Sequence, residues 1–203
     1  MVISADRGTF GGGFADLNQT PTAAAQRAAL LRGQVLVDPE YCPEGGGAVT
    51  AQMYVPLAKK QLWPQLTSYS RWPQFFPNIT HSEVLETVKA SGQRYRRLYQ
   101  VGRKGFLMLT AQVEIYLKVF ENLGEGLLDP QSRPRIQFRF EQGTFSHFAA
   151  DLVLQDFQEG TLLTYSVQAK PLIPVPGFLI EQAMRHDLPG NMEQMRRVLC
   201  GQR

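Results

Sequence analysis

The chain has 203 residues, of which 43% are hydrophobic and 19% charged, and its formal net charge at pH 7 is +3. This length suits one domain with a tail, and the composition excludes a chain that is disordered throughout. The charge is too small to indicate a nucleic-acid partner by itself, although it permits contact with an anionic surface. The N-terminal sequence lacks a signal-peptide core, and no run approaches the roughly 18 apolar residues of a membrane span. We therefore expect a cytoplasmic protein.

Before the compact domain, the sequence predicts a mobile tail, a short helix and a loop. Residues 1–19 are rich in glycine and polar residues, which is typical of a tail. Pro21 at a first helical position and Gly33 just past the end favour a helix between them. The segment 34–37 could form a short strand, and the prolines and glycines of 38–47 predict a loop.

The compact domain is predicted to span 47–203, with 1–46 outside it. Alternating apolar residues predict a first strand at 49–55. Pro56 then opens a helix, which Pro64 should kink or break because its ring removes an amide donor.

An aromatic segment, SRWPQFFPNIT, follows this helix. Trp72, Phe75 and Phe76 lie within five residues there, between Pro73 and Pro77. Two interpretations remain open for them: a helix-to-strand corner packed into the core, or the rim of a pocket.

From residue 79 onward, apolar and polar residues alternate as in an antiparallel meander. The glycines of GRKG at 102–105 predict a turn between the second and third of these strands. Six strands are predicted here, at 79–88, 94–101, 106–121, 136–141, 144–155 and 161–169.

The strand at 106–121 shows the clearest alternation. From Leu107 to Val119 one set of alternate residues is entirely apolar, whereas the other set contains Gln112 and Glu114. Its length is roughly three times the mean for a strand, and such a strand normally bends around a helix or a cavity. We therefore expect its apolar face to form the floor of a ligand pocket.

The end of the chain has the period of an amphipathic helix. Pro189 and Gly190 should kink this helix near its middle. Its apolar stripe consists of Ile180, Met184, Leu188, Met192, Met195 and Leu199.

Together these elements predict an α+β domain in which a curved seven-stranded antiparallel sheet wraps around the C-terminal helix. A helix about 10 Å across cannot fill the hollow of such a sheet, so a cavity between them is expected. The methionines of the stripe suit variable contents, although they also suit an ordinary core.

The order of elements, together with KKQLWPQLTSYSRWPQFFPNITHSEVLE, VEIYLKVFE, FAADLVLQ and TLLTYSVQAKPLIPVPGFLIEQAM, resembles the polyketide cyclase/START superfamily. Within it, the coenzyme-Q-binding START-like or cyclase/dehydrase-like branch is the most similar. The resemblance covers about residues 47–200 and implies the helix-grip fold. Members hold lipids, quinones, sterols or polyketides between the sheet and the terminal helix.

The resemblance also implies a set of ligand-binding positions in the helical corner, on the strands and on the terminal helix. They are Phe75, Phe76, Leu109, Ala111, Val113, Phe138, Phe148, Tyr165, Phe178, Ile180 and Met184. Tyr165 and Arg139 are candidates for a polar anchor, although Arg139 is out of phase with Phe138 and should face outward.

The residues show little sign of catalysis, and no catalytic residue, metal site or cofactor is predicted. His147 and Asp151 share a strand face but should lie roughly 13 Å apart. His186 is adjacent to Asp187 on a helix, and such neighbours do not face each other. His81 and Glu83, two apart on a strand, should reach each other only loosely. The two cysteines, Cys42 and Cys200, are expected to be independent thiols.

A basic cluster lies on the predicted hairpin around residue 99. A solvated hairpin edge is the expected role, because charges keep sheet edges from pairing. Contact with phosphates of a lipid headgroup or of RNA is an alternative. The cluster consists of Arg94, Arg96, Arg97, Arg103 and Lys104.

These observations favour a binding or carrier protein for a hydrophobic small molecule such as a lipid, an isoprenoid or a quinone. One alternative is an aromatase/cyclase-type enzyme, which needs ionisable groups inside the pocket. The other is an interaction module for a ribosome or membrane complex, which includes peripheral membrane contact. The oligomeric state is left open.

Overall fold

The computed structural model describes residues 21–40, 42, 45–90, 92–106, 109–172 and 175–202. Among these residues, eight strands form one antiparallel sheet in the order β1-β2-β8-β7-β6-β5-β4-β3. The strands are β1 (Leu36–Glu40), β2 (Gly47–Val55), β3 (Ile79–Ala90), β4 (Gln93–Phe106), β5 (Leu109–Asn122), β6 (Arg135–Gly143), β7 (Phe145–Phe157) and β8 (Gly160–Pro171).

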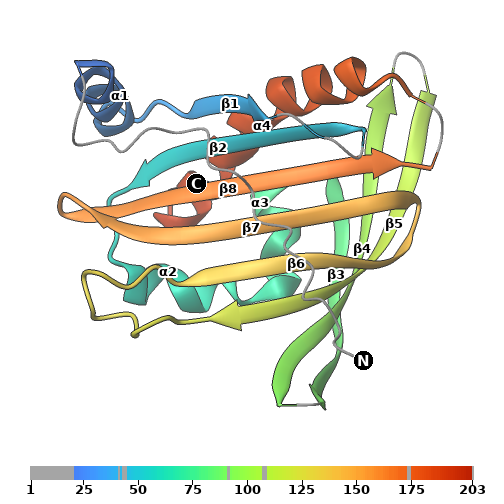
Figure 1. Cartoon of the computed structure of the whole chain (residues 1–203), viewed down its shortest axis with the longest axis horizontal. Helices are drawn as coiled ribbons and strands as arrows, with labels where there is room; N and C mark the ends of the chain where they lie inside the picture. The colour runs from blue at the N-terminus through green and yellow to red at the C-terminus, as the bar shows by residue number, and fades with distance from the viewer. Residues whose placement is uncertain are drawn as a thin grey trace, which may run out of the picture.

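The helices gather mainly on one face of this sheet. Figure 1 looks onto the opposite face, with α2, α3 and the end of α4 behind the strands. The helices are α1 (Pro21–Leu31), α2 (Lys59–Leu66), the 3-10 turn η1 (Tyr69–Arg71), α3 (Trp72–Phe75) and α4 (Gly177–Leu199). We call the helix-covered face of the sheet the inner face.

The predicted α+β architecture is confirmed, but the number of strands was one too low. Residues 36–40 form β1, which pairs with β2 along the edge of the sheet, although part of this segment was predicted to be a loop. Pro39 is compatible with this strand because an edge strand does not need every amide.

The turn predicted at 102–105 is wrong. β4 continues as a strand through all four residues to Phe106, and Gly102 pairs with Val113 of β5. The predicted strand 106–121 therefore begins later, since Phe106 ends β4 and β5 starts at Leu109.

Among the described helices, α2 and α4 have a proline in their interior, and the two prolines affect their helices differently. α2 includes Pro64 and ends two residues later, with the Thr67 hydroxyl donating to the carbonyl of Trp63. α4 runs as one helix through Pro189 for 23 residues. Both cysteines are free.

Candidate functional site

The strand register decides which side chains face the helices. Leu117 pairs with Leu98 on β4 and with Phe140 on β6, so these three side chains lie on the inner face. On the next strands Tyr165 pairs with Ala51 and with Leu152. Because successive side chains of a strand point to opposite faces, the register shows which residues of each strand face the helices.

One end of the inner face is packed solid by the helical corner. Phe138 is fully buried there, with the Trp72 ring 4.8 Å away and the Tyr69 ring edge-on at 6.1 Å. Leu152 and Phe75 are also fully buried. Aromatic rings at these separations form a well-packed core.

Burial decreases along the same strands towards the other end. On β8, the exposed fraction of the side chains rises from 0% at Leu163 to 7% at Tyr165 and 9% at Val167 and Ala169. On β5, Ile115 is 7% exposed, and Val113 beyond it is only half-buried. The end of β8 and the start of β5 lie at the same end of the antiparallel sheet, at the right in Figure 1. We call this less buried end of the inner face the half-open end, and the end around Phe138 the solid end.

Aromatic side chains at the start of β7 belong to this half-open end. Phe148 pairs with Ala169, and its ring lies 5.8 Å from that of Phe145. Both rings are half-buried although they pack against the core.

The N-terminal half of α4 lies over this end and is held close to β2 by glycines. A Cβ on Gly47 would lie 2.8 Å from the Glu181 amide nitrogen and 3.0 Å from the Met184 sulfur. A Cβ on Gly177 would lie 2.6 Å from the carbonyl oxygen of Gly46. Only residues without a side chain allow the helix and the strand to approach this closely.

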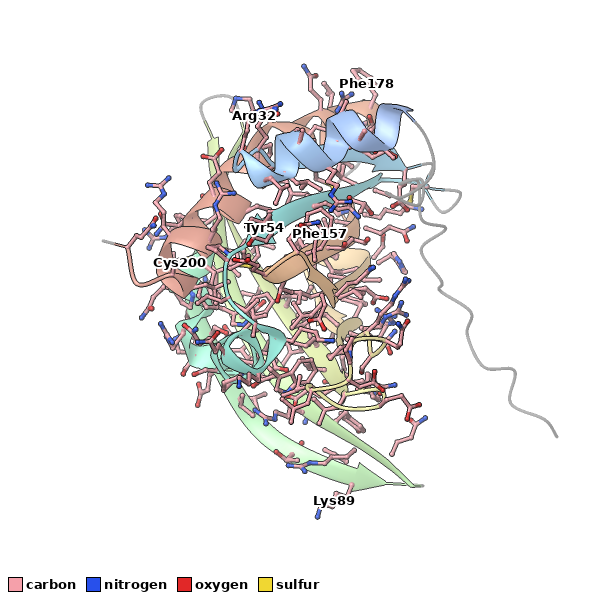
Figure 2. All side chains as sticks on the ribbon, turned by 90° about the vertical axis from the view of Figure 1, so that its left-hand side faces the viewer. Arg32, Tyr54, Lys89, Phe157, Phe178 and Cys200 are labelled. Atoms are coloured by element: carbon pink, nitrogen blue, oxygen red, sulfur yellow. The ribbon has the colours of Figure 1, made fainter. Side chains whose placement is uncertain are left out.

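α4 is also more exposed in this half than in the other. Leu188, Met192, Met195 and Leu199 are buried, whereas Ile180 and Met184 are half-buried. Phe178 is 68% exposed, and Figure 2 shows it at the top edge of the molecule.

The predicted site residues therefore separate into groups. Phe75 and Phe138 lie in the solid end, and Phe178 lies on the outside. The structure describes the backbone of Leu109 and Ala111 in β5, but their side chains lie outside the described residues. The half-open end and its border with the solid core contain Phe76, Val113, Phe148, Tyr165, Ile180 and Met184.

A polar pair on the inner face was not predicted from the sequence. Gln100 Nε2 donates to the Ser82 hydroxyl over 3.1 Å, and both residues are buried. Gln100 pairs with Ile115 in the ladder, so it faces inward next to the half-open end. Its position two residues after the apolar Leu98 was the available signal for this orientation.

The sequence model of the family described as "Polyketide cyclase / dehydrase and lipid transport" matches residues 55–196. The chain belongs to this family. Comparison with curated proteins gives no match. Family membership and the fold together support a role in binding or transferring a hydrophobic ligand.

Solved structures share the same fold at low sequence identity. A STAR-related lipid transfer protein from Xanthomonas axonopodis superposes with a TM-score of 0.65 at 12% identity, covering 82% of this chain and 94% of that one. A START superfamily protein from Mycobacterium smegmatis gives 0.56 at 15% identity, covering 75% and 98%. Human StAR-related lipid transfer protein 5 gives 0.57 at 11% identity, covering 88% and 94%. The architecture is therefore the START helix-grip fold.

Among the residues that the structure describes, a cluster of ionisable groups on the inner face lies at the solid end. The Tyr69 hydroxyl donates to Glu121 over 2.7 Å, and Arg96 Nε lies 3.3 Å from the same carboxylate oxygen. Burial raises the pKa of Tyr69, and the Glu121 charge raises it further. The three side chains provide one another's hydrogen-bond and charge partners, which favours a structural role.

The basic cluster differs from a simple solvated edge. Arg96 faces inward, as just described, and Arg97 bonds to Glu86 over 2.7 Å and to Glu141 over 2.9 Å. Acidic partners therefore offset two charges of the cluster. Arg94 and Arg103 are exposed.

Two histidines contact carboxylates on the surface. His186 Nδ1 lies 3.2 Å from Asp187 Oδ1, so the expectation that these neighbours do not face each other is wrong. His81 Nε2 lies 3.3 Å from Glu83 Oε2. Both histidines are exposed, which suits ordinary surface pairs better than acid–base chemistry. Among the described residues, no helix is long and apolar enough to cross a membrane.

Proposed function

We propose that this protein binds one hydrophobic small molecule, a lipid, an isoprenoid or a quinone, and carries or sequesters it. The ligand would lie between the inner face and the N-terminal half of α4. Quinones are included because the sequence resembles the coenzyme-Q-binding branch.

The fall in burial along β8 and β5 supports this proposal most directly. Here the apolar inner face continues past Tyr165 on β8 and past Ile115 on β5, while its cover becomes incomplete. Incompletely covered apolar surface on the inside of a domain is suited to an apolar ligand.

The ligand must be long to be retained by apolar contact. Burying one methylene contributes about 0.8 kcal/mol, so ten carbons contribute roughly 8 kcal/mol. Association itself costs roughly 4–15 kcal/mol. We therefore expect a chain of well over ten carbons, or a shorter one with a polar anchor. Leu109 and Ala111 are proposed to extend the apolar surface towards the β4–β5 end.

The direct test is mass spectrometry of an organic extract of the protein purified from its native host. We expect one class of apolar molecule to be enriched in a ratio approaching one per protein. An extract with only the lipid mixture of the host, in traces, would contradict the proposal.

A matched pair of variants connects the ligand to the site. Met184→Lys places a charge on the face of α4 that lies over the sheet, whereas Gln182→Lys adds the same charge at an exposed position two residues earlier. Met184→Lys should reduce the recovered ligand at least tenfold while the protein remains folded by circular dichroism. Gln182→Lys should retain it. Equal retention in both variants would place the ligand elsewhere.

A further inference from the structure

Tyr165 combines a polar atom with a buried position on the inner face. The residue lies on β8 at the border between the solid core and the half-open end, and it is 7% exposed. Its ring packs 5.7 Å from that of Phe76 in the helical corner. The ring therefore belongs to the wall of the proposed site.

The Tyr165 hydroxyl has no hydrogen-bond partner among the described residues. The other buried tyrosine of this face behaves differently, because the Tyr69 hydroxyl donates to Glu121. The Tyr165 oxygen is not fully enclosed by protein, so a ligand can replace the water that reaches it. An unpaired hydroxyl in the wall of a binding site is therefore a position where a ligand atom can supply the missing bond.

The chemistry around this hydroxyl favours a neutral ligand atom. Burial, and then the negative charge of Asp151, raise the pKa of Tyr165, so the hydroxyl keeps its proton and acts as a donor. Arg139, the other anchor suggested by the sequence, faces the outer side and bonds to Asp151 over 2.6 Å. On the inner face, the described cation Arg96 is paired with Glu121. A buried carboxylate or phosphate would find no free positive charge among the described residues of this wall.

We propose that the Tyr165 hydroxyl donates a hydrogen bond to an uncharged oxygen of the ligand, so that the site selects neutral carbonyl-, ether- or hydroxyl-bearing apolar molecules over carboxylates and phosphates. This inference rests on the proposed function and narrows its ligand class. It assigns Tyr165 as a specificity-determining residue.

The test uses three probes with the same number of carbons: dodecan-2-one, dodecane and dodecanoate. The ketone only accepts hydrogen bonds, the alkane forms none, and the carboxylate is ionised at pH 8. Their affinities for the full-length protein are measured by displacement of the neutral dye Nile red. The informative variant is Tyr165→Phe, which removes one oxygen and keeps the ring against Phe76.

The ketone should bind Tyr165→Phe about five- to tenfold more weakly than the wild-type protein, because one hydrogen bond is lost. Dodecane should bind the two proteins equally well, and dodecanoate should bind the wild type more weakly than the ketone. Tyr54→Phe is the control, since the register of β2 and β8 places Tyr54 on the outer face of the sheet, where its ring lies 6.1 Å from that of Phe157 (Figure 2). It should leave all three affinities unchanged.

The outcomes separate the two proposals. If dodecane and the ketone bind but Tyr165→Phe changes neither, the role of Tyr165 is wrong and the carrier proposal stands. Tighter binding of dodecanoate than of the ketone would also overturn selection for a neutral oxygen. If neither the dye nor any of the three probes binds the wild type, the carrier proposal and this inference fail together.

Discussion

The Tyr69 hydroxyl lies 2.7 Å from a carboxylate oxygen of Glu121 and connects the helical corner to β5. Arg96 completes the contact, since its guanidinium pairs with Glu121 and lies 5.4 Å from the centre of the Tyr69 ring. The same side chain also donates to the carbonyl of Thr67. One arginine thus fixes the segment after α2 to the inner face of the sheet.

Arg96 should therefore contribute more to stability than its neighbour Arg97. The two side chains are almost equally exposed, at 30% and 31%. Arg96→Met leaves the Thr67 carbonyl without a donor and Glu121 without its positive partner, and we expect a loss of about 1–2 kcal/mol in the free energy of unfolding. Arg97→Met leaves Glu86 and Glu141 able to contact water, and we expect about 0.5 kcal/mol. Urea denaturation of both variants measures the difference, and a larger loss for Arg97→Met would refute this ranking.

Two buried tyrosines should make stability fall in alkaline solution. Burial raises the pKa of both Tyr69 and Tyr165 above the ordinary value of 10.0. Their contribution is complete below pH 10, where tyrosine is protonated in both states. It decreases at higher pH because only the unfolded chain releases these protons, by about 1.4 kcal/mol per pH unit for each residue. Melting temperatures between pH 9 and 11 should fall less steeply for Tyr69→Phe/Tyr165→Phe than for the wild type; parallel curves would contradict the assignment.

Lys59 is a buried cation that joins three segments. Its ammonium group donates to the carbonyls of Asp129 and Ser132 over 2.8 and 2.9 Å and lies 3.2 Å from Asp156. Lys59→Met should cost about 2–4 kcal/mol, because two carbonyls lose their donor. The adjacent Lys60 is exposed, so Lys60→Met should change stability by less than about 0.5 kcal/mol. Similar melting temperatures for the two variants would show that these contacts do not stabilise the fold.

Two glycines should respond in opposite directions to an added methyl group. At Gly47 the methyl would meet the backbone of α4, so Gly47→Ala should destabilise the protein by about 1–3 kcal/mol. At Gly190, inside α4, a methyl meets nothing within 4 Å. Gly190→Ala should stabilise by about 0.5–1 kcal/mol, because alanine loses less conformational freedom in a helix. Thermal denaturation of the two variants measures these opposite changes in stability. Stabilisation by Gly47→Ala would mean that α4 does not pack against β2.

Periodicity predicted most of the fold because strands such as β6 alternate between covered and less covered side chains. The apolar stripe of α4 was predictable for the same reason, because its residues are more buried than those on the opposite side of the helix. Pairing partners outside the local sequence explain the errors. GRKG has the composition of a turn, yet Gly102 lies where β4 passes the Asn78 carbonyl, which accepts a hydrogen bond from the Arg103 amide. That contact stabilises the extended chain over the local preference.

The candidate site was less predictable than the fold, because depth of burial depends on which helix covers each strand position. Phe75 is fully buried in the solid core, whereas its neighbour Phe76 reaches towards Tyr165 at the border. Alternation gives the face of a strand residue but not its distance from the open end. The pair Ser82–Gln100 also depends on the register of β3 and β4, which shifts twice along the strands and cannot be read from composition.

The position of β1 has a practical consequence for shortened versions of the protein. The family match begins at residue 55, and the first 46 residues look dispensable by sequence. Yet β1 covers the edge of β2, a nine-residue strand whose side chains are almost all buried. A chain truncated at residue 47 would present a long, apolar, unpaired edge, which is the kind of surface through which sheets of different molecules join and precipitate. Expression and crystallisation trials should therefore retain residues 36–40.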